Sequence, residues 1–399
     1  MQRRKRHIGG ILAILLVVFI VLYGYYSYRM PVPALAAQSS LNKSQQRSAA
    51  DLPWPNYGAS AIGAVGYGVL ASHGSDKPIP TASVAKTMTA LTVLQKNPLS
   101  PGETGPTITL TKADVGYYDK YFDVGGSIVP VSNGEKITEY QALEAMMLPS
   151  ANNMASSLAD WAFGSEQNYT AYANKQAEKL GMSDTHFADA SGFSPKTVST
   201  ASDLVKLGIQ ALQNPALAKI VSEKTAKIPV AGVIHNVNWL LNYDQFNGIK
   251  TGSTDQDGGA ILYSEPKTYP NGQTVTIVGV IMGAKLLSKA MNDVFPLIHA
   301  AQNNFKQTTV IHNGQVVGHY DVPWDVPVDA VATKSLDLMA WRGRNITPHI
   351  SFKQLQAPSE KGVVVGKITT DAMPGQSVSV ITKRATVEPG VLWRAFRNL

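Results

Sequence analysis

The chain has 399 residues, 44% apolar and 16% charged, a composition ordinary for a globular protein and a length sufficient for two or three domains. The formal net charge of +7 is mildly basic and the lysines and arginines are scattered, so nucleic-acid binding has little support. The sequence contains no cysteine, which excludes disulfides and thiolate chemistry.

The first predicted element is an apolar segment behind a basic end. The basic residues are Arg3, Arg4, Lys5 and Arg6. The apolar run that follows extends from Ile8 to about Tyr28, long enough to cross a hydrocarbon layer of roughly 30 Å as a helix. The basic cluster predicts a cytoplasmic N-terminus and an external remainder. We therefore expect residues 1–28 to be a signal anchor of a single-pass cell-membrane protein.

A cleaved signal peptide is the alternative. The sequence ALAA at 34–37 is typical of a signal-peptidase site, and cleavage that leaves Ala37 as the mature N-terminus would give a secreted protein. That site lies far beyond the apolar run, and the run exceeds the about 7–15 residues typical of a signal peptide. The uncleaved anchor is the favoured interpretation, and residues 29–50 are expected to be a linker.

Residues 51–305 alternate helical and strand patterns between short turns. A strand is expected over residues 61–71. Two further strands, GGAILYS and TVTIVGVIMGA, flank the hairpin-type turn YPNGQ. Helices are predicted over residues 81–94, 139–164 with a break at Pro149, 169–181 and 289–305. This alternation indicates an α/β fold.

The character of the sequence changes after about Gln307. The segments VVGHYDVPWDVPVDAV, KGVVVGKITT and GQSVSVITKRATV are short β-branched runs between turns. We therefore expect residues 306–399 to form a small all-β domain.

The helix predicted over residues 81–94 carries a serine and a lysine in its first turn, after Thr81 as a plausible N-cap. Ser83 and Lys86 are three residues apart and therefore lie on one face. A lysine is the unfavourable charge at this end of a helix dipole. Helix stability therefore does not explain why Lys86 is there.

The pattern S-x-x-K occurs three times, at residues 40–43, 83–86 and 264–267. The first match lies in the polar linker. The third contains Pro266, which would disrupt a helix. Only the match that begins at Ser83 opens a plausible helix after a strand.

Two further motifs follow in the chain. The segment SANN places Ser150 and Asn152 at a break between two helices, and NGIKTGST contains Lys250-Thr251-Gly252, the only K-T-G triplet. The order S-x-x-K, S-x-N, K-T-G is nearly the motif set of penicillin-binding proteins and β-lactamases.

Over residues 51–305 the chain resembles the D-alanyl-D-alanine carboxypeptidases of the low-molecular-mass penicillin-binding protein family. The segments GGSIVPVSNGEKITEYQALEAMMLPSANN, KLGMSDTHFADASGF and FNGIKTGSTDQDGG resemble family segments in family order. Weaker similarity continues at LQAPSEKGVVVGKI. The resemblance implies an antiparallel sheet with helices on both faces and a helical subdomain, the active-site groove between them, and then the small all-β domain. It implies that no cofactor or metal is needed.

The chain departs from the family at two places. Asn153 follows the S-x-N triplet where the family usually has aspartate, but it lies outside the triplet. Many members end in an amphipathic membrane helix, whereas VLWRAFRNL is only about two turns, so the N-terminal segment is expected to be the anchor. Ser191 and Gly192 match the family segment DASGF, and we assign them no chemical role.

The resemblance implies roles around the first two motifs. Ser83 would be the nucleophile, and Lys86 the base that removes its proton. Lys86 then needs a depressed pKa, which burial and the cation of Lys250 would provide. Ser150 would relay a proton to the leaving amine. Asn152 would orient Lys86 and hold the amide of the substrate.

The K-T-G motif is implied to bind substrate. Lys250 and Thr251 would bind its terminal carboxylate. Gly252 has no side chain, so an extended peptide can lie against the strand edge. The backbone N–H groups of Ser83 and Ser253 would form the oxyanion hole.

The expected function is therefore removal of the terminal D-alanine from peptidoglycan stem peptides, with β-lactams as inhibitors. A β-lactamase of this motif set needs a deacylating glutamate about 35 residues after the middle motif, where this chain reads MSDTHFADASGF. The intact motifs argue against the hypothesis of a non-enzymatic wall-binding protein. Neither G-x-S-x-G nor H-E-x-x-H occurs, which disfavours other hydrolases. The sequence does not separate carboxypeptidase from endopeptidase or transpeptidase action.

Overall fold

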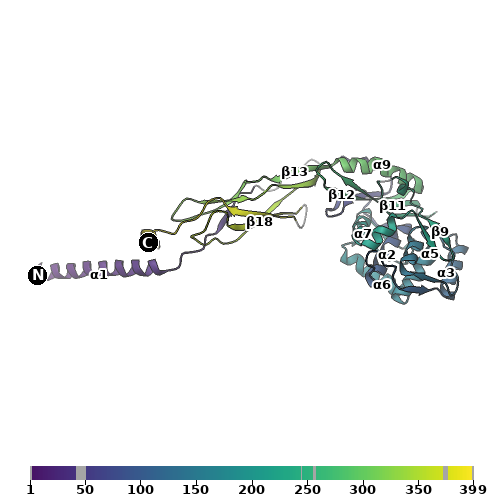
Figure 1. The fold of residues 1–399 in the computed structure, drawn as a ribbon, viewed down its shortest axis with the longest axis horizontal. Coiled ribbons are helices and arrows are strands. Elements are labelled where there is room, and N and C mark those ends of the chain that lie inside the picture. Colours follow the sequence, from purple (N-terminus) through teal and green to yellow (C-terminus); the bar gives the residue numbers. More distant parts are fainter. Residues whose placement is uncertain (1, 42–50, 244, 255–257, 372–375, 398–399) are drawn as a thin grey trace. The chain divides into compact units, whose positions relative to one another are not determined.

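The structure is a computed structural model that describes residues 2–41, 51–243, 245–254, 258–371 and 376–397, with side chains from residue 10 onward. The chain forms two compact units (Figure 1). The larger unit comprises Ser48–Lys306 and Trp341–Arg344, and the smaller comprises Met1–Arg47, Gln307–Ala340 and Asn345–Leu399.

A five-stranded antiparallel sheet forms the centre of the larger unit. In spatial order its strands are β10 (Gly248–Thr254), β11 (Gly258–Thr268), β12 (Thr274–Ala284), β2 (Ala59–Ala64) and β3 (Gly68–Gly74). The register places Lys250 opposite Leu262 and Leu262 opposite Val280. The strands predicted at GGAILYS and TVTIVGVIMGA are confirmed. The single strand predicted over residues 61–71 is wrong, because the chain turns back at Gly66, which has φ +83°, and forms the β2–β3 hairpin.

Helices cover both faces of this sheet. Side chains alternate along a strand, so Leu262 and Val280 point to one face, where they join the apolar core that contains Leu204 of α7 (Ala201–Gln213). The alternate residues of β11 and β12 are also buried, and α9 (Leu287–Asn303) packs against both strands. The predicted α/β class, an antiparallel sheet flanked by helices, is confirmed.

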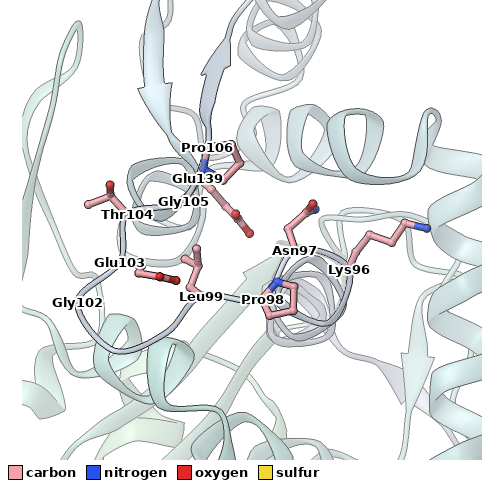
Figure 2. Close-up of a pocket in the computed structure, with 10 residues that line it drawn as sticks. All are labelled: Lys96, Asn97, Pro98, Leu99, Gly102, Glu103, Thr104, Gly105, Pro106 and Glu139. Carbon is pink, nitrogen blue, oxygen red and sulfur yellow. The ribbon is translucent and has the colours of Figure 1, made fainter.

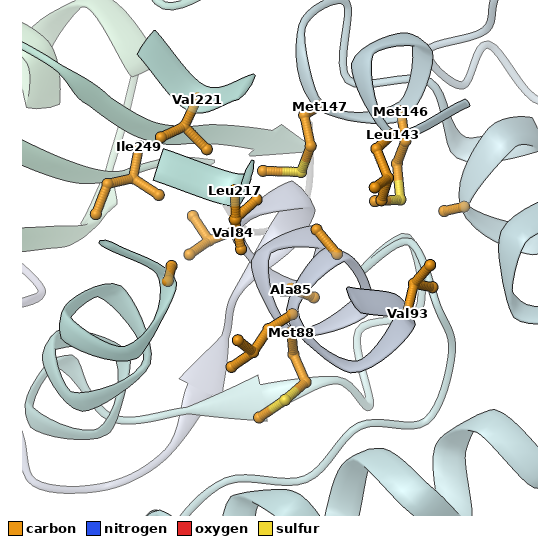
Figure 3. Close-up of a cluster of buried hydrophobic side chains, with 14 of the residues drawn as sticks. Val84, Ala85, Met88, Val93, Leu143, Met146, Met147, Leu217, Val221 and Ile249 are labelled. Carbon is orange, nitrogen blue, oxygen red and sulfur yellow. The ribbon is translucent and has the colours of Figure 1, made fainter. Parts of the chain in front are cut away.

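The helical part of the larger unit surrounds one buried helix. A short 3-10 turn, η1 (Ala82–Ala85), leads into α2 (Lys86–Lys96), whose residues up to Leu94 are buried. Figure 3 shows Met88 and Val93 among side chains from neighbouring elements, including Leu143 and Met146. The helices that pack on α2 are α4 (Glu139–Met147), α5 (Asn152–Phe163), α6 (Glu166–Lys179), α7 and α8 (Pro215–Ser222), and α3 (Lys112–Asp123) packs on α5.

Short paired strands complete the larger unit. The pairs are β4 (Ile79–Pro80) with β7 (Val198–Ser199), β5 (Thr107–Thr109) with β6 (Lys136–Thr138), and β8 (Thr225–Ile228) with β9 (Gly232–His235). A second 3-10 turn, η2 (Trp239–Asn242), precedes β10.

The smaller unit contains the β structure that the C-terminal sequence predicts. Its six-stranded sheet has the order β1 (Ala37–Ser39), β14 (Val316–Tyr320), β15 (Val328–Ala332), β19 (Val378–Thr382), β18 (Val364–Thr370), β17 (Pro348–Phe352). A two-stranded sheet pairs β13 (Phe305–Ile311) with β16 (Leu336–Trp341). Part of the segment expected to be a linker differs from that expectation: β1 is an edge strand, and Leu35 is buried in the core of this unit.

The N-terminal segment of the smaller unit is the helix α1 (Gln2–Arg29). Residues Gly10–Arg29 have a mean hydropathy of 2.2, and this helix is long and apolar enough to cross a membrane. The short helix α10 (Val391–Phe396) lies beside it, where Arg397 donates hydrogen bonds to the carbonyls of Ser27 and Pro31.

Candidate active site

The serine of the first motif lies on a strained turn. Thr81 is at the N-cap position, as predicted, but its hydroxyl donates to carbonyls instead of capping the helix. Ala82 has φ +46°, in the left-handed region that residues with a Cβ rarely adopt. Such strained residues are concentrated at functional sites. Here the strained residue immediately precedes Ser83.

Lys86 lies beneath this turn and is fully buried. Its Nζ is 2.8 Å from Ser83 Oγ, 2.6 Å from Asn152 Oδ1 and 2.8 Å from the carbonyl oxygen of Ser191. The last two atoms are fixed acceptors, and a neutral lysine amine has two N–H groups and one lone pair. When both N–H groups donate to those acceptors, the lone pair is directed at the Ser83 hydroxyl, the arrangement that a general base requires.

The charge state of Lys86 is set by its surroundings. Burial lowers the pKa of Lys86 far below its ordinary value, and the neighbouring cation of Lys250 lowers it further. The carboxylate of Asp189 acts in the opposite direction. Burial also lowers the pKa of Lys250 to about 7. Lys86 is therefore available as a neutral amine at a pH where an exposed lysine would be charged.

The second motif connects α4 to α5. Ser150 is buried and has φ +65°, so a strained residue occurs here too. The backbone N–H of Asn152 donates to the carbonyl of Ser127 at 2.7 Å, which fixes the start of α5. In the described part of the chain no hydrogen bond joins Ser150 to Ser83 or Lys86. Of the two motif residues, Asn152 is the one that forms a hydrogen bond with Lys86 in the described part of the chain.

Asn153 has a structural role. Its amide oxygen accepts the N–H of Val129 at 3.1 Å, and its amide nitrogen donates to the carbonyl of the same residue at 2.9 Å. This pair of bonds needs both a donor and an acceptor, which a carboxamide provides and a carboxylate does not. The departure from the usual aspartate therefore leaves the contact between Lys86 and Asn152 intact.

The third motif lies on β10, directly against the Ser83 turn. A Cβ added at Gly252 would be 2.9 Å from the Ser83 backbone nitrogen and 3.1 Å from the carbonyl oxygen of Thr81. Lys250 and Thr251 are buried, and Lys250 Nζ donates to the carbonyl of Thr251 at 3.0 Å. The absence of a side chain at Gly252 thus lets β10 approach the Ser83 turn. This packing reason differs from the predicted one, which was room for an extended peptide at the strand edge.

A cleft of about 470 Å³ brings residues of the first two motifs together with Ser253, which follows the K-T-G triplet. Its lining includes Ser83, Asn152 and Ser253. The other lining residues are Val124, Gly125, Gly126, Ser127, Gly192, Phe193, Ser194, Pro195 and Thr254. Lys86, Ser150, Lys250, Thr251 and Gly252 are not among these lining residues and are nearly or fully buried.

The other two S-x-x-K matches do not form such a site. Ser264 is on strand β11, and its hydroxyl donates to Asn247 Oδ1 at 2.7 Å. Ser40 donates its backbone N–H to Val317 in the smaller unit, and Lys43 lies outside the described residues. The choice of Ser83 from its helical position is thus supported by the geometry.

Sequence reasoning missed the part played by the segment DASGF. The Ser191 carbonyl contacts Lys86, and Gly192 has φ +71° and packs against the Ser83 turn. The similarity to the family segment pointed to these residues, but a backbone carbonyl can come from any residue type. No motif in the sequence distinguishes Asp189, which precedes them.

A second pocket, of about 710 Å³, contains no residue of the three motifs (Figure 2). It is lined by Glu139, by Lys96 at the end of α2, and by residues 97–99 and 102–106 of the loop that follows. Glu139 is fully buried, neither of its carboxylate oxygens has a hydrogen-bond partner among the described residues, and burial raises its pKa to about 7. This pocket and the cleft at Ser83 share no lining residue.

Comparison with known proteins agrees with this geometry. A family model described as D-alanyl-D-alanine carboxypeptidase, peptidase S11, matches residues 61–285. The chain is 28% identical over 303 residues to the D-alanyl-D-alanine carboxypeptidase DacD of Salmonella typhimurium, covering 72% of this chain and 74% of that protein. It is 34% identical over 206 residues to a D-alanyl-D-alanine endopeptidase of Haemophilus influenzae, covering 49% and 65% of the two chains.

A solved structure shares the fold over most of the chain. The crystal structure of penicillin binding protein 5 from Haemophilus influenzae has a TM-score of 0.60 and 20% sequence identity. The match covers 88% of this chain and 100% of that one.

Proposed function

Because the chain belongs to the peptidase S11 family of D-alanyl-D-alanine carboxypeptidases, we propose that it removes the terminal D-alanine from peptidoglycan stem peptides through an acyl-enzyme on Ser83. One observation carries the mechanism. Lys86 Nζ is 2.8 Å from Ser83 Oγ, while its two N–H groups have fixed acceptors on Asn152 and Ser191. A serine hydroxyl is a weak nucleophile unless such a base takes its proton.

Acylation starts when Ser83 Oγ attacks the carbonyl carbon between the two D-alanines and its proton passes to Lys86. The negative charge that develops on the substrate oxygen is stabilised by the backbone N–H groups of Ser83 and Ser253. Two observations support this pairing: Gly252 lies against the Ser83 nitrogen, and Ser253 lines the same cleft as Ser83. Ser150 relays the proton to the leaving amine, and water then hydrolyses the ester.

The K-T-G strand holds the substrate. Lys250 and Thr251 bind the terminal carboxylate, and Asn152 holds the amide of the stem peptide. Because burial lowers the pKa of Lys250 to about 7, an arriving carboxylate stabilises the charged form of this lysine. Substrate binding and the charge of Lys250 are therefore linked.

Mass spectrometry of the products from a synthetic pentapeptide stem tests the proposal. Loss of a single alanine by the parent, but not by a Ser83→Ala variant, is the expected result. One relative is an endopeptidase, so a cross-linked dimeric peptide is the second substrate. Cleavage of the cross-bridge without release of alanine from the pentapeptide would replace the carboxypeptidase proposal with endopeptidase action.

The proposed site of action is outside the cytoplasmic membrane, with α1 as a single-pass anchor and the basic N-terminus in the cytoplasm. The apolar length of α1 and the basic residues before it support this topology. The full-length protein is expected to fractionate with membranes and resist extraction by high salt. A chain starting at Met30, which keeps β1, is expected to be soluble and active. A mature protein that begins near Ala37 and is soluble would contradict the anchor.

A further inference from the structure

The carboxylate of Asp189 gathers donors from the loop that follows it. Its Oδ2 accepts the backbone N–H groups of Ser191 at 3.3 Å, Phe193 at 2.9 Å and Ser194 at 3.4 Å. The hydroxyl of Ser191 donates to the same oxygen at 2.7 Å, and the hydroxyl of Thr197 donates to Oδ1. Hydrogen bonds to a charged acceptor are the strong ones, so this carboxylate fixes the loop.

These hydrogen bonds to Asp189 fix the position of the Ser191 carbonyl. Backbone N–H groups on both sides of the peptide bond between Ser191 and Gly192 point to Asp189, and the Ser191 carbonyl accepts from Lys86 at 2.8 Å. A Cβ at Gly192 would be 1.9 Å from the carbonyl oxygen of Ala82, so the loop lies directly on the Ser83 turn. Asp189 therefore holds one of the two acceptors that orient the lysine.

The loop is also fixed to α2 and α6. Thr89, one turn after Lys86, donates its hydroxyl to the carbonyl of Ala190 at 2.7 Å. The N–H of Ala190 donates to Glu166 Oε1 at 2.9 Å. Glu166 of α6 is therefore bonded to the loop that contains Asp189, but through Ala190 and not through Ser191, whose carbonyl accepts from Lys86.

The charged groups that act on Lys86 are one cation and one anion. Lys250, from β10, disfavours the charged amine, and Asp189 favours it. Glu166 and Tyr169, from α6, and Thr89, from α2, also face this loop; Glu166 and Asp189 both act on the Tyr169 hydroxyl. Asp189 thus supplies negative charge near Lys86 from the loop whose Ser191 carbonyl accepts from the Lys86 amine.

We propose that Asp189 is a positioning residue for acylation, which holds the Ser191 carbonyl against the Lys86 amine and supplies the negative charge that opposes Lys250. The inference rests on the proposed function, because it takes Lys86 as the base. Asp189 does not line the cleft, and loop donors occupy its oxygens, so it does not serve as a base toward the acyl-enzyme.

The test is the pH dependence of kcat/KM for the Asp189→Asn variant. Removing the negative charge lowers the pKa of Lys86, so the lysine becomes neutral at a lower pH. The acid limb of the profile is expected to move down by about 0.5–1 pH unit. The side-chain amide of the variant also has a donor in place of one acceptor oxygen, so the maximal kcat/KM of the pH profile is expected to fall about tenfold.

Two control variants distinguish the effects of the charge and the position of Asp189 from a general loss of structure. Glu166→Gln removes the negative charge of the α6 residue that binds Ala190 of this loop, and is expected to leave the acid limb in place. Thr197→Val keeps the charge but removes one donor to Asp189, and is expected to lower kcat about threefold or more without moving the acid limb down. If Asp189→Asn does not fold, the kcat of Thr197→Val still tests the inference.

The outcomes distinguish this inference from the proposed function. If Lys86→Ala abolishes turnover but folded Asp189→Asn keeps the parent acid limb, the role of Asp189 is wrong and the function stands. An equal shift in Glu166→Gln would also contradict the specific role of Asp189, as would a parent kcat in Thr197→Val. If Lys86→Ala retains near-normal turnover, the proposed function itself fails.

Discussion

Gly252 lies so close to Ser83 that a Cβ on the glycine would be 2.9 Å from the serine backbone nitrogen. Cβ atoms essentially never come this close to another heavy atom, so a side chain there forces β10 and the Ser83 turn apart. The two backbone N–H groups proposed for the oxyanion hole belong to these two segments. Their separation therefore depends on the absence of a side chain at Gly252.

The Gly252→Ala variant is expected to fold and to acylate Ser83 about 10²-fold more slowly, since a displacement of about 1 Å at an active site has an effect of this size. The rate of labelling by a fluorescent penicillin measures it. Gly116→Ala is the matched control, because nothing lies within 4 Å of a Cβ there and Gly116 is an exposed position inside helix α3. Equal acylation rates in the two variants would contradict the packing argument.

The Lys86→Ala variant is expected to fold, because alanine is a good helix former and the position begins α2. It leaves acceptors on Asn152 and Ser191 without their donor, so its melting temperature is expected to fall. Loss of a general base lowers the rate by about 10²–10⁴-fold. Turnover of the pentapeptide and circular dichroism check the two expectations, and near-normal turnover would remove Lys86 from the mechanism.

The buried Glu139 predicts a pH dependence of stability that is separate from catalysis. Its pKa is raised by burial to about 7 in the folded protein, against 4.5 for an ordinary glutamate. Between these values the unfolded chain has lost the proton that the folded protein retains, so the free energy of unfolding falls as pH rises from about 4.5 to about 7. Above that window the loss is complete.

Glu139→Gln removes this titration. The variant is expected to be more stable than the parent at pH 8 by about 1–3 kcal/mol, and to differ little from it at pH 4. Thermal melts of the full-length protein in detergent at both pH values measure the difference. Glu103→Gln, at an exposed glutamate of the same pocket, controls for loss of a surface charge. A Glu139→Gln variant no more stable than the parent at pH 8 contradicts the prediction.

The sequence predicted the contact between Ser83 and Lys86 because one helical turn brings positions i and i+3 together. It also predicted the contact of Lys86 with Asn152, through the resemblance to a family. The apolar patterns did not predict the helices α3, α7 and α8 or the short strands β4 to β9, but they predicted β11, β12 and the helices α2, α4, α5, α6 and α9. These features depend on side-chain type and local spacing, which a sequence displays.

Other features depend on backbone geometry and on distant packing. The Ser191 carbonyl is a backbone atom that no residue type identifies. The hydrogen bonds that the Asp189 carboxylate accepts from its own loop depend on the folded conformation of that loop, which the sequence does not display. The strand predicted over residues 61–71 is a hairpin because Gly66 turns the chain, which apolar composition does not reveal. β1 joins a sheet whose other strands come from residue 316 onward, and Leu35 lies in the core of the same unit, so this segment has the local sequence character of a linker.

The intact mass of the protein after mixing with penicillin tests the central claim most directly. The β-lactam carboxylate is expected to bind at Lys250 and Thr251 while Ser83 opens the ring, and the tethered amine then obstructs the approach of water. No glutamate or aspartate lines the cleft in the described part of the chain. We therefore predict one added drug mass that persists far longer than the peptide acyl-enzyme and is absent in Ser83→Ala. Rapid penicillin turnover without an adduct, or labelling at Ser40 or Ser264, would contradict the account.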